Sequence, residues 1–262
     1  MERERILFVD GGAGRLRVSD GGAGEPAVVF LHGLGSDLET WRAQLDHLRP
    51  GRRAVAYDQR GHGGSDRARD GVYTIEALAR DLEAVANALG LRTFFLAGHS
   101  LSGTVITSYA GAHPERVAGL VYVDAVGDFG AVPGVMEQQL RAEESPAFGA
   151  AQRAAFFAGM LGPPAKAATR DHVLAALARL DPPAFAALRR SMADFRVGGR
   201  LSSYRAPILA IEAVGAEYPI MASKVIAGAT RTTLSGVSHW LMMDDPEAFD
   251  RALDPFIGFA RR

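Results

Sequence analysis

The stretch FFLAGHSLSGTVI, residues 94–106, passes from an apolar run into small residues around a serine and then into a second apolar run. The first run is typical of a buried strand, and the second begins a helix. Gly98 lies two residues before Ser100, and Ser102 lies two residues after it. Both are small, as a sharp turn requires at positions where neighbouring backbones come close together. The sequence therefore predicts a strand-to-helix turn that presents Ser100 at the end of a strand, beside a helix N-terminus.

A serine in this setting is suited to nucleophilic catalysis. Its hydroxyl is a weak nucleophile unless a base removes the proton and fixed N–H donors stabilise the oxyanion that develops. A Gly- and Ser-rich turn between a strand and a helix is also compatible with a structural connection or a phosphate-binding loop. The turn by itself therefore leaves these alternatives open.

Composition restricts the class of protein. The chain has 262 residues, of which 48% are hydrophobic and 23% charged, which favours one α/β domain with an insertion over two separate domains. A net charge of -1 provides no field for nucleic acid or an anionic membrane, so a small-molecule substrate is expected. The absence of cysteine excludes disulfides, thiolate metal sites and a cysteine nucleophile.

The start of the chain, MERERILFVDGG, carries charge without a following apolar segment. No run approaches the roughly 18 apolar residues that span a bilayer. We expect a cytoplasmic protein from these two features.

Short apolar runs alternate with helical patterns, which indicates parallel strands joined by crossover helices. The expected strands are Arg5–Val9, Arg15–Ser19, Ala27–Leu31, Arg53–Asp58, Thr93–Ala97, Gly119–Asp124, Pro207–Glu212 and Arg231–Leu234. The first two should form a hairpin, because DGGAG between them supplies glycines for the positive φ angles of a turn.

Two helices have clear boundaries. Thr74 is the expected N-cap of an amphipathic helix that Gly90 ends. A closing helix should have Asp245 as its N-cap and Pro246 at its first position.

The strand pattern stops between Ala125 and Ala206, where Ala-rich helical segments are separated by GPP and DPP. Their apolar residues keep helical spacing, which favours a helical insertion over a disordered linker. The predicted domains are therefore a core of residues 1–124 and 207–262 and a helical cap of residues 125–206.

Two further segments accompany the serine turn. VVFLHGLGSDLETW, residues 28–41, resembles the H-G-x-G loop of α/β-hydrolases, and VAYDQRGHGGSD, residues 55–66, resembles their D-x-R-G-x-G-x-S segment. The turn itself resembles the G-x-S-x-G nucleophile elbow of that family, with Ser102 in place of the last glycine. The resemblance implies an α/β fold: a mostly parallel eight-stranded sheet flanked by helices, with a helical cap inserted after strand 6.

The resemblance also implies site residues. Ser100 would be the nucleophile, the backbone N–H groups of Leu34 and Leu101 would form the oxyanion hole, and no cofactor would be needed. His239 follows the last strand after the SGVS loop, where the family places its base. The other six histidines have weaker contexts: His99 in the turn, His32 bracing its own loop, His62 in a Gly-rich turn, and His47, His113 and His172 in helical stretches.

The third member of the triad has several candidates. In most relatives it is an aspartate after the seventh strand, but PILAIEAVGAEYPI, residues 207–220, contains none. Other members of the family carry it at the end of the sixth strand, where this chain has Asp124. Asp124 is therefore favoured, with Glu217 as the main alternative and Glu212, Asp128 or no acid as the others.

These residues predict a carboxylic ester hydrolase that acts through an acyl-enzyme on a small ester or acyl substrate. Lactone, thioester, amide or carbon–carbon cleavage stays open, and so does a receptor that uses the same pocket without catalysis. A serine nucleophile disfavours dehalogenase and epoxide-hydrolase chemistry, which proceeds through an aspartyl ester. No metal-ligand spacing occurs, and Gly33-Leu34-Gly35 lacks the rest of a dinucleotide fingerprint. The substrate and the oligomeric state are not encoded in any motif.

Overall fold

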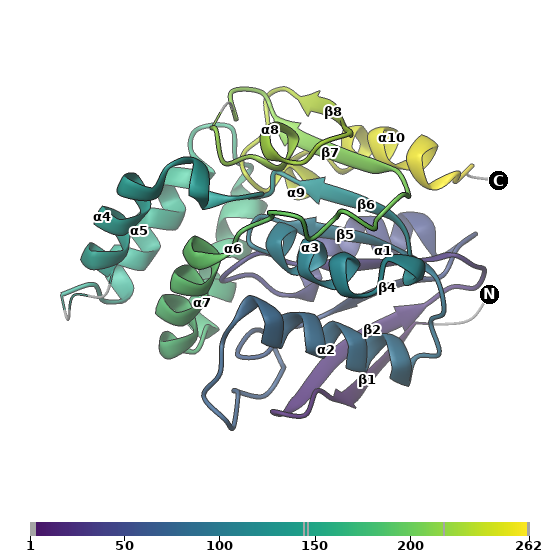
Figure 1. Ribbon diagram of the computed structural model, residues 1–262, viewed down its shortest axis with the longest axis horizontal. Helices are drawn as coiled ribbons and strands as arrows, with labels where there is room; N and C mark the ends of the chain where they lie inside the picture. The colour runs from purple at the N-terminus through teal and green to yellow at the C-terminus, as the bar shows by residue number, and fades with distance from the viewer. Residues whose placement is uncertain (1–3, 144, 146, 217, 261–262) are drawn as a thin grey trace.

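The computed structural model describes residues 4–143, 145, 147–216 and 218–260, which form an eight-stranded sheet covered by helices (Figure 1). The strands are β1 (Arg5–Asp10), β2 (Arg15–Gly21), β3 (Ala27–Leu31), β4 (Ala54–Tyr57), β5 (Phe94–His99), β6 (Val117–Val123), β7 (Ile208–Ala213) and β8 (Ala229–Leu234). Their order across the sheet is β1-β2-β4-β3-β5-β6-β7-β8. All eight expected strands are confirmed.

Pairing in the sheet is antiparallel only at one edge. β1 and β2 form the expected hairpin, and β2 also pairs with β4 in antiparallel register. Every pair from β4 to β8 is parallel. The carboxyl ends of the parallel strands therefore lie at one edge, where ligand sites of such sheets are found.

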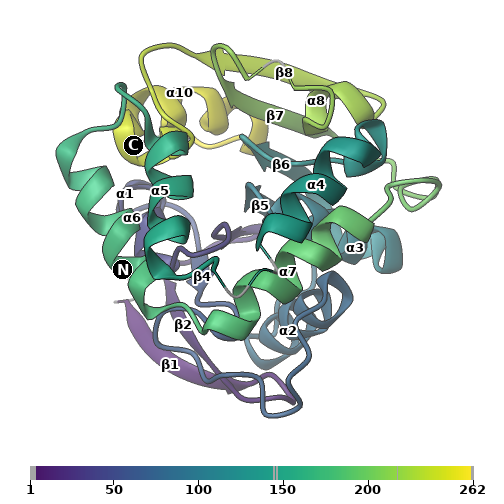
Figure 2. The ribbon, with the colours of Figure 1, turned by 90° about the vertical axis from the view of Figure 1, so that its left-hand side faces the viewer.

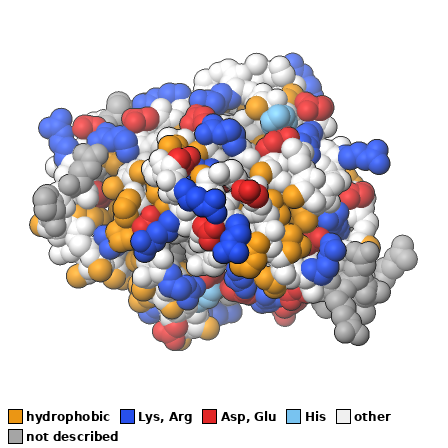
Figure 3. All heavy atoms as spheres, turned by 90° about the horizontal axis from the view of Figure 1, so that it is seen from below, with side chains coloured by type: hydrophobic (Ala, Val, Ile, Leu, Met, Phe, Trp, Pro, Cys, Tyr) orange, Lys and Arg blue, Asp and Glu red, His pale blue; other side chains and the backbone are white. Residues whose placement is uncertain are grey.

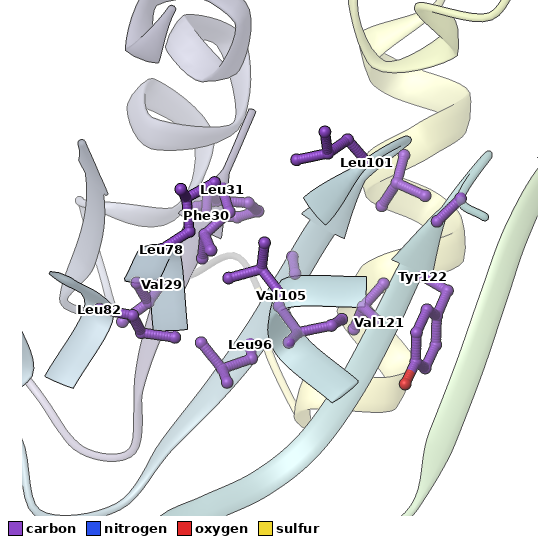
Figure 4. Packing of buried hydrophobic residues seen from close by; sticks show 14 of the residues in the cluster. Val29, Phe30, Leu31, Leu78, Leu82, Leu96, Leu101, Val105, Val121 and Tyr122 are labelled. Carbon is purple, nitrogen blue, oxygen red and sulfur yellow. The ribbon is translucent and has the colours of Figure 1, made fainter. Parts of the chain in front are cut away.

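The core consists of the central strands and the helices on either face. All five residues of β3 and all four of β4 are buried, as expected of strands covered on both sides. Figure 4 shows Leu78 and Leu82 of α2 and Val105 of α3 near side chains of β3 and β5. Burial of these apolar side chains holds α2 and α3 against the sheet.

The flanking helices are α1 (Arg42–Leu48), α2 (Ile75–Ala88), α3 (Ser102–Ala112), α8 (Ala222–Val225), α9 (Leu241–Asp244) and α10 (Pro246–Ile257). Short 3-10 helices are η1 (Leu38–Trp41), η2 (Pro114–Arg116) and η3 (Phe129–Ala131). The Thr74 side chain accepts from Ala77 N, and that of Asp245 accepts from Ala248 N, so both predicted N-caps are confirmed.

Four helices follow β6 as expected: α4 (Pro133–Glu143), α5 (Ala150–Leu161), α6 (Ala167–Arg179) and α7 (Pro182–Asp194). Figure 2 shows α5 and α6 on one side and α4 and α7 on the other, with the ends of β5 and β6 between them. These helices therefore stand over the edge of the sheet at which Ser100 is placed.

The surface carries both signs of charge. On the face shown in Figure 3, Lys and Arg side chains are mixed with Asp and Glu rather than separated from them. Among the residues that the structure describes, no helix combines the length and apolar character needed to cross a bilayer.

Candidate active site

Ser100 lies on a strained turn between β5 and α3. Its φ angle is +54°, a left-handed conformation that is uncommon for a residue with a side chain. Three backbone hydrogen bonds hold it: Ser100 N donates to Val123 O (3.1 Å), and Ser100 O accepts from Gly103 N (3.0 Å) and Val126 N (3.2 Å). Strain of this kind persists only where the surroundings enforce it, and it is concentrated at functional sites.

The two small neighbours of Ser100 have different requirements. A Cβ on Gly98 would stand 2.6 Å from Ser102 O, so glycine is needed there. Ser102 has room for its side chain, which donates to His32 O (2.6 Å) and accepts from Gln59 Nε2 (3.1 Å). The residue that replaces the family's glycine therefore ties the elbow to the loop after β3.

His239 and Asp124 are in direct contact. His239 Nδ1 lies 2.6 Å from Asp124 Oδ2, and the two side chains are 16% and 8% exposed. Asp124 Oδ1 accepts from Ala213 N (3.0 Å). Because a carboxylate only accepts, Nδ1 carries the proton and Nε2 is left as the basic nitrogen.

The alternative carboxylates have other partners. Glu212 is fully buried in β7 and pairs with Arg231 Nε (2.7 Å), as expected of a sheet residue. Asp128 accepts from Gly130 N (2.6 Å) and Val197 N (2.9 Å). Glu217 lies outside the described residues. Of the carboxylates that the structure describes, Asp124 is the one that contacts His239 Nδ1.

The backbone N–H groups of Leu34 and Leu101 have no acceptor among the described residues. Both residues line the same cavity as Ser100 and His239. A Cβ on Gly33 would come within 3.0 Å of Ser100 Cβ, so the loop that carries Leu34 packs closely against the elbow. These two N–H groups are therefore available to an oxygen bound at Ser100.

His99 has a role that its position in the sequence did not indicate. It is buried, its ring centroid is 4.6 Å from that of His239, and its Nε2 donates to the His239 carbonyl (2.9 Å). Burial lowers the pKa of His99 well below its usual value, so the ring stays neutral beside His239. His32 braces its own loop as expected, with Nδ1 donating to Gly33 O and Nε2 accepting from Gln59 N.

Helix α6 of the cap is bonded to both loops that flank the serine. Asp37, after the Leu34 loop, accepts from Arg179 and His172, the latter at 2.9 Å. His172 is therefore not the plain surface residue expected from its helix. Burial opposes ionisation of Asp37, but its hydrogen bond to His172 and the nearby charges outweigh burial and lower its pKa to about 2.

Asp244 makes the second connection to α6. This buried side chain accepts from Ser238 N (2.8 Å), next to His239, through Oδ2. Its Oδ1 accepts from Lys166 N (3.0 Å), at the start of α6. The position of the cap helix is thereby coupled to that of the histidine loop.

Ser100, His239 and Asp124 line one cavity of about 690 Å³ beneath the cap. Its wall is predominantly apolar, with Phe129, Met136, Phe156, Phe157, Met160 and Met192 among its residues. No group of three or more metal-ligating side chains is found within the described part of the chain. The cavity thus suits a neutral, largely apolar molecule.

Comparison with known proteins identifies the family of the fold. The family model described as alpha/beta hydrolase fold matches residues 26–183, which is more than half of the chain. Epoxide hydrolase 3 of Xenopus tropicalis is 36% identical over 123 residues, which are 46% of this chain and 33% of that protein. The sn-1-specific diacylglycerol lipase ABHD11 of Mus musculus is 38% identical over 117 residues, 44% of this chain and 37% of that protein. The matches thus span little more than a third of these relatives.

A solved structure is similar over nearly the whole fold. The crystal structure of a hydrolase from Pseudomonas aeruginosa PA01 has a TM-score of 0.82 and 25% identity, and the match covers 97% of this chain and 99% of that one. Together with the strand order and the family model, this shows that the chain belongs to the α/β-hydrolase fold family.

Proposed function

We propose that this protein hydrolyses carboxylic esters through a serine acyl-enzyme. The observation that carries the proposal is the 2.6 Å contact of His239 Nδ1 with Asp124 Oδ2, in the wall of the cavity that Ser100 also lines. It supports an oriented base in the same cavity as a serine on a strained turn, and serine nucleophiles need such a base.

In the proposed reaction, Ser100 Oγ attacks the ester carbonyl while His239 Nε2 takes its proton. The N–H groups of Leu34 and Leu101 stabilise the oxyanion of the tetrahedral intermediate. Collapse of the intermediate breaks the C–O bond, and His239 returns the proton to the departing alcohol. Water, activated by the same histidine, then releases the acid, while Asp124 stays ionised and stabilises the imidazolium.

The residue at position 100 favours acyl chemistry over epoxide opening, although an epoxide hydrolase is among the relatives. Epoxide opening through an aspartyl ester would need a carboxylate there. The lipase among the relatives, which by its name cleaves esters, is consistent with an ester substrate. Lactones, thioesters and amides present the same acyl carbon, so they are included in the experiment below.

In this proposal the catalytic core comprises residues 1–124 and 207–262, and residues 125–206 form the cap. Helices α4, α5 and α7 supply much of the apolar cavity wall, including Met136, Phe157 and Met192. The cap would select the acyl or alcohol group, and the core would perform the chemistry.

The experiment is hydrolysis of p-nitrophenyl acetate and butyrate, with a lactone, a thioester and an anilide as alternative acyl substrates. Ser100→Ala should reduce turnover to the rate of the uncatalysed reaction. The matched control is Ser108→Ala, which replaces a serine of α3, the helix that follows the elbow, and should retain activity. Equal product release by wild type and Ser100→Ala, with every substrate, would instead support a receptor without catalysis.

A further inference from the structure

A polar group of three residues lies in the cap and meets the predominantly apolar cavity wall. Gln139 and Glu143 belong to α4, and Arg189 belongs to α7; we call these three residues the cap cluster. Arg189 and Gln139 line the cavity. The Arg189 side chain is only 6% exposed, so its charge is largely removed from solvent.

Glu143 holds the Arg189 guanidinium with a two-pronged contact. Glu143 Oε2 accepts from Arg189 Nε (2.9 Å), and Oε1 accepts from Nη2 (2.7 Å). Nη2 also donates to Gln139 Oε1 (3.3 Å). The ring of Phe156 lies 5.2 Å from Arg189 Cζ, which further fixes the guanidinium plane.

Several donors of the cap cluster remain available. A guanidinium has five N–H donors, and the contacts above use those of Nε and Nη2. Nη1 of Arg189 and the amide nitrogen of Gln139 have no acceptor within the described residues. Arg189 is buried while Gln139 is exposed, and both line the cavity, so these N–H groups can exchange water for an acceptor bound there.

The charge of the cluster indicates which acceptor fits. Glu143 neutralises Arg189, so the pair offers N–H groups with little net positive charge. A carboxylate placed there would gain little attraction and would approach Glu143, whereas a carbonyl oxygen accepts without adding charge.

We propose that the cap cluster binds a second carbonyl oxygen of the substrate, separate from the ester carbonyl that Ser100 attacks. This rests on the proposed ester hydrolysis at the same cavity. The preferred substrates are then esters of oxo-acids, with an apolar chain between the two carbonyl carbons that contacts the Phe and Met side chains of the wall.

The test compares methyl esters of straight-chain acids with homologues that carry a ketone at successive chain positions. Hydrolysis is measured as the release of acid at constant pH. One ketone position should raise kcat/KM about tenfold over the parent ester, the gain expected from a hydrogen bond to a charged donor. A homologue that ends in a carboxylate should show no such gain.

Replacement of both charges tests the cluster without leaving one of them unpaired. Glu143→Met with Arg189→Met should reduce the ketone-to-parent ratio to about one, since apolar replacement of a buried pair is generally tolerated. Gln139→Leu should lower the ratio partly. The matched control is Arg60→Met with Asp81→Met, which removes an equally buried pair outside the cavity and should keep the wild-type ratio.

The ratio is measured within one variant, so a change in stability or in the amount of folded protein cancels. The cap-cluster proposal would be overturned if no ketone position raised kcat/KM of the wild type, or if the ketone-to-parent ratio were unchanged in the double variant. Neither result would contradict ester hydrolysis. A preference for the carboxylate homologue would overturn the choice of a neutral acceptor. Failure to hydrolyse any ester would instead contradict the proposed function.

Discussion

Asp124 and His239 are 115 residues apart in the chain, yet Asp124 Oδ2 lies 2.6 Å from His239 Nδ1. Asp124 directly follows β6 and has a φ angle of +41°, so both it and Ser100, after neighbouring β5, have left-handed backbones. Each therefore turns sharply at the end of its strand. The loop after β8 brings His239 to the same edge of the sheet.

Asp124→Asn should lower kcat for p-nitrophenyl butyrate by about 10³–10⁴-fold, because an amide no longer stabilises the imidazolium or fixes its tautomer. Asparagine tolerates a positive φ angle, so the substitution adds little backbone strain. Steady-state kinetics and thermal unfolding of the same samples check both points. Glu217→Gln is the comparison and should keep near wild-type kcat; loss of kcat in that variant, with Asp124→Asn nearly silent, would assign the acid to Glu217.

Ser102→Ala should cost about 1 kcal/mol of unfolding free energy, the usual worth of the hydrogen bond from Ser102 Oγ to His32 O. Its kcat should stay within about tenfold of wild type, because Ser100 remains in place. Gly98→Ala should be the more damaging change, since its Cβ would stand 2.6 Å from a backbone oxygen. Denaturant unfolding and ester hydrolysis of the two variants test whether Gly98→Ala is more damaging than Ser102→Ala. Abolished activity in Ser102→Ala would mean that Ser102 takes part in the chemistry.

Asp244→Asn should misplace the histidine loop. Both carboxylate oxygens accept backbone N–H groups, from Ser238 and Lys166, and an amide can replace only one of them. We expect kcat for p-nitrophenyl acetate to fall by about tenfold or more, with little change in KM, because this short ester needs few cap contacts.

Asp245→Asn is the matched control for that experiment. Asp245 is the next residue and caps α10 through Ala248 N (2.9 Å), a role that asparagine also fills. Its kcat should equal that of wild type. A raised KM with unchanged kcat in Asp244→Asn would mean that the cap acts only in substrate binding.

Stability should decline in mild acid because of buried neutral histidines. Burial lowers the pKa of His32 to about 4 and that of His62 to about 3. In the unfolded chain both histidines bind protons below about pH 6.5, whereas in the folded chain they stay neutral. The free energy of unfolding is therefore highest above about pH 6.5 and decreases as the pH falls toward the pKa values of the folded state. Urea unfolding at pH 7.5 and pH 5 should show this loss.

His62→Asn removes one of these titrations while keeping a donor for Arg60 O, which His62 Nδ1 now contacts at 3.0 Å. Between pH 7.5 and pH 5 the variant should lose about 2 kcal/mol less stability than wild type, in line with 1.5 pH units of avoided protonation. Identical pH dependence of the two proteins would contradict this assignment.

The local elements could be predicted because their signals are local. Thr74 and Asp245 mark helix starts through bonds to residues three positions later, and the strands are short apolar runs between turn residues. The strand limits differ from the prediction: β6 begins at Val117 rather than Gly119, and β5 continues to His99 rather than Ala97. Those limits depend on pairing with neighbouring strands.

The contacts of the cap could not be predicted. The bonds from His172 to Asp37 and from Asp244 to Lys166 join segments far apart in the chain. The pairing of Arg189 with Glu143 depends on how α7 meets α4. In Ala-rich helices, the sequence pattern indicates an apolar face without indicating which neighbour that face meets.

By itself, the sequence determined the sheet, the helical segment after its sixth strand and the turn around Ser100, because periodicity, capping and glycine positions act within a few residues. Only the tertiary structure decided which described carboxylate meets His239. Glu212 and Asp124 stand at the ends of adjacent strands, but Glu212 pairs with Arg231 inside the sheet, whereas the left-handed turn at Asp124 brings its carboxylate to the imidazole.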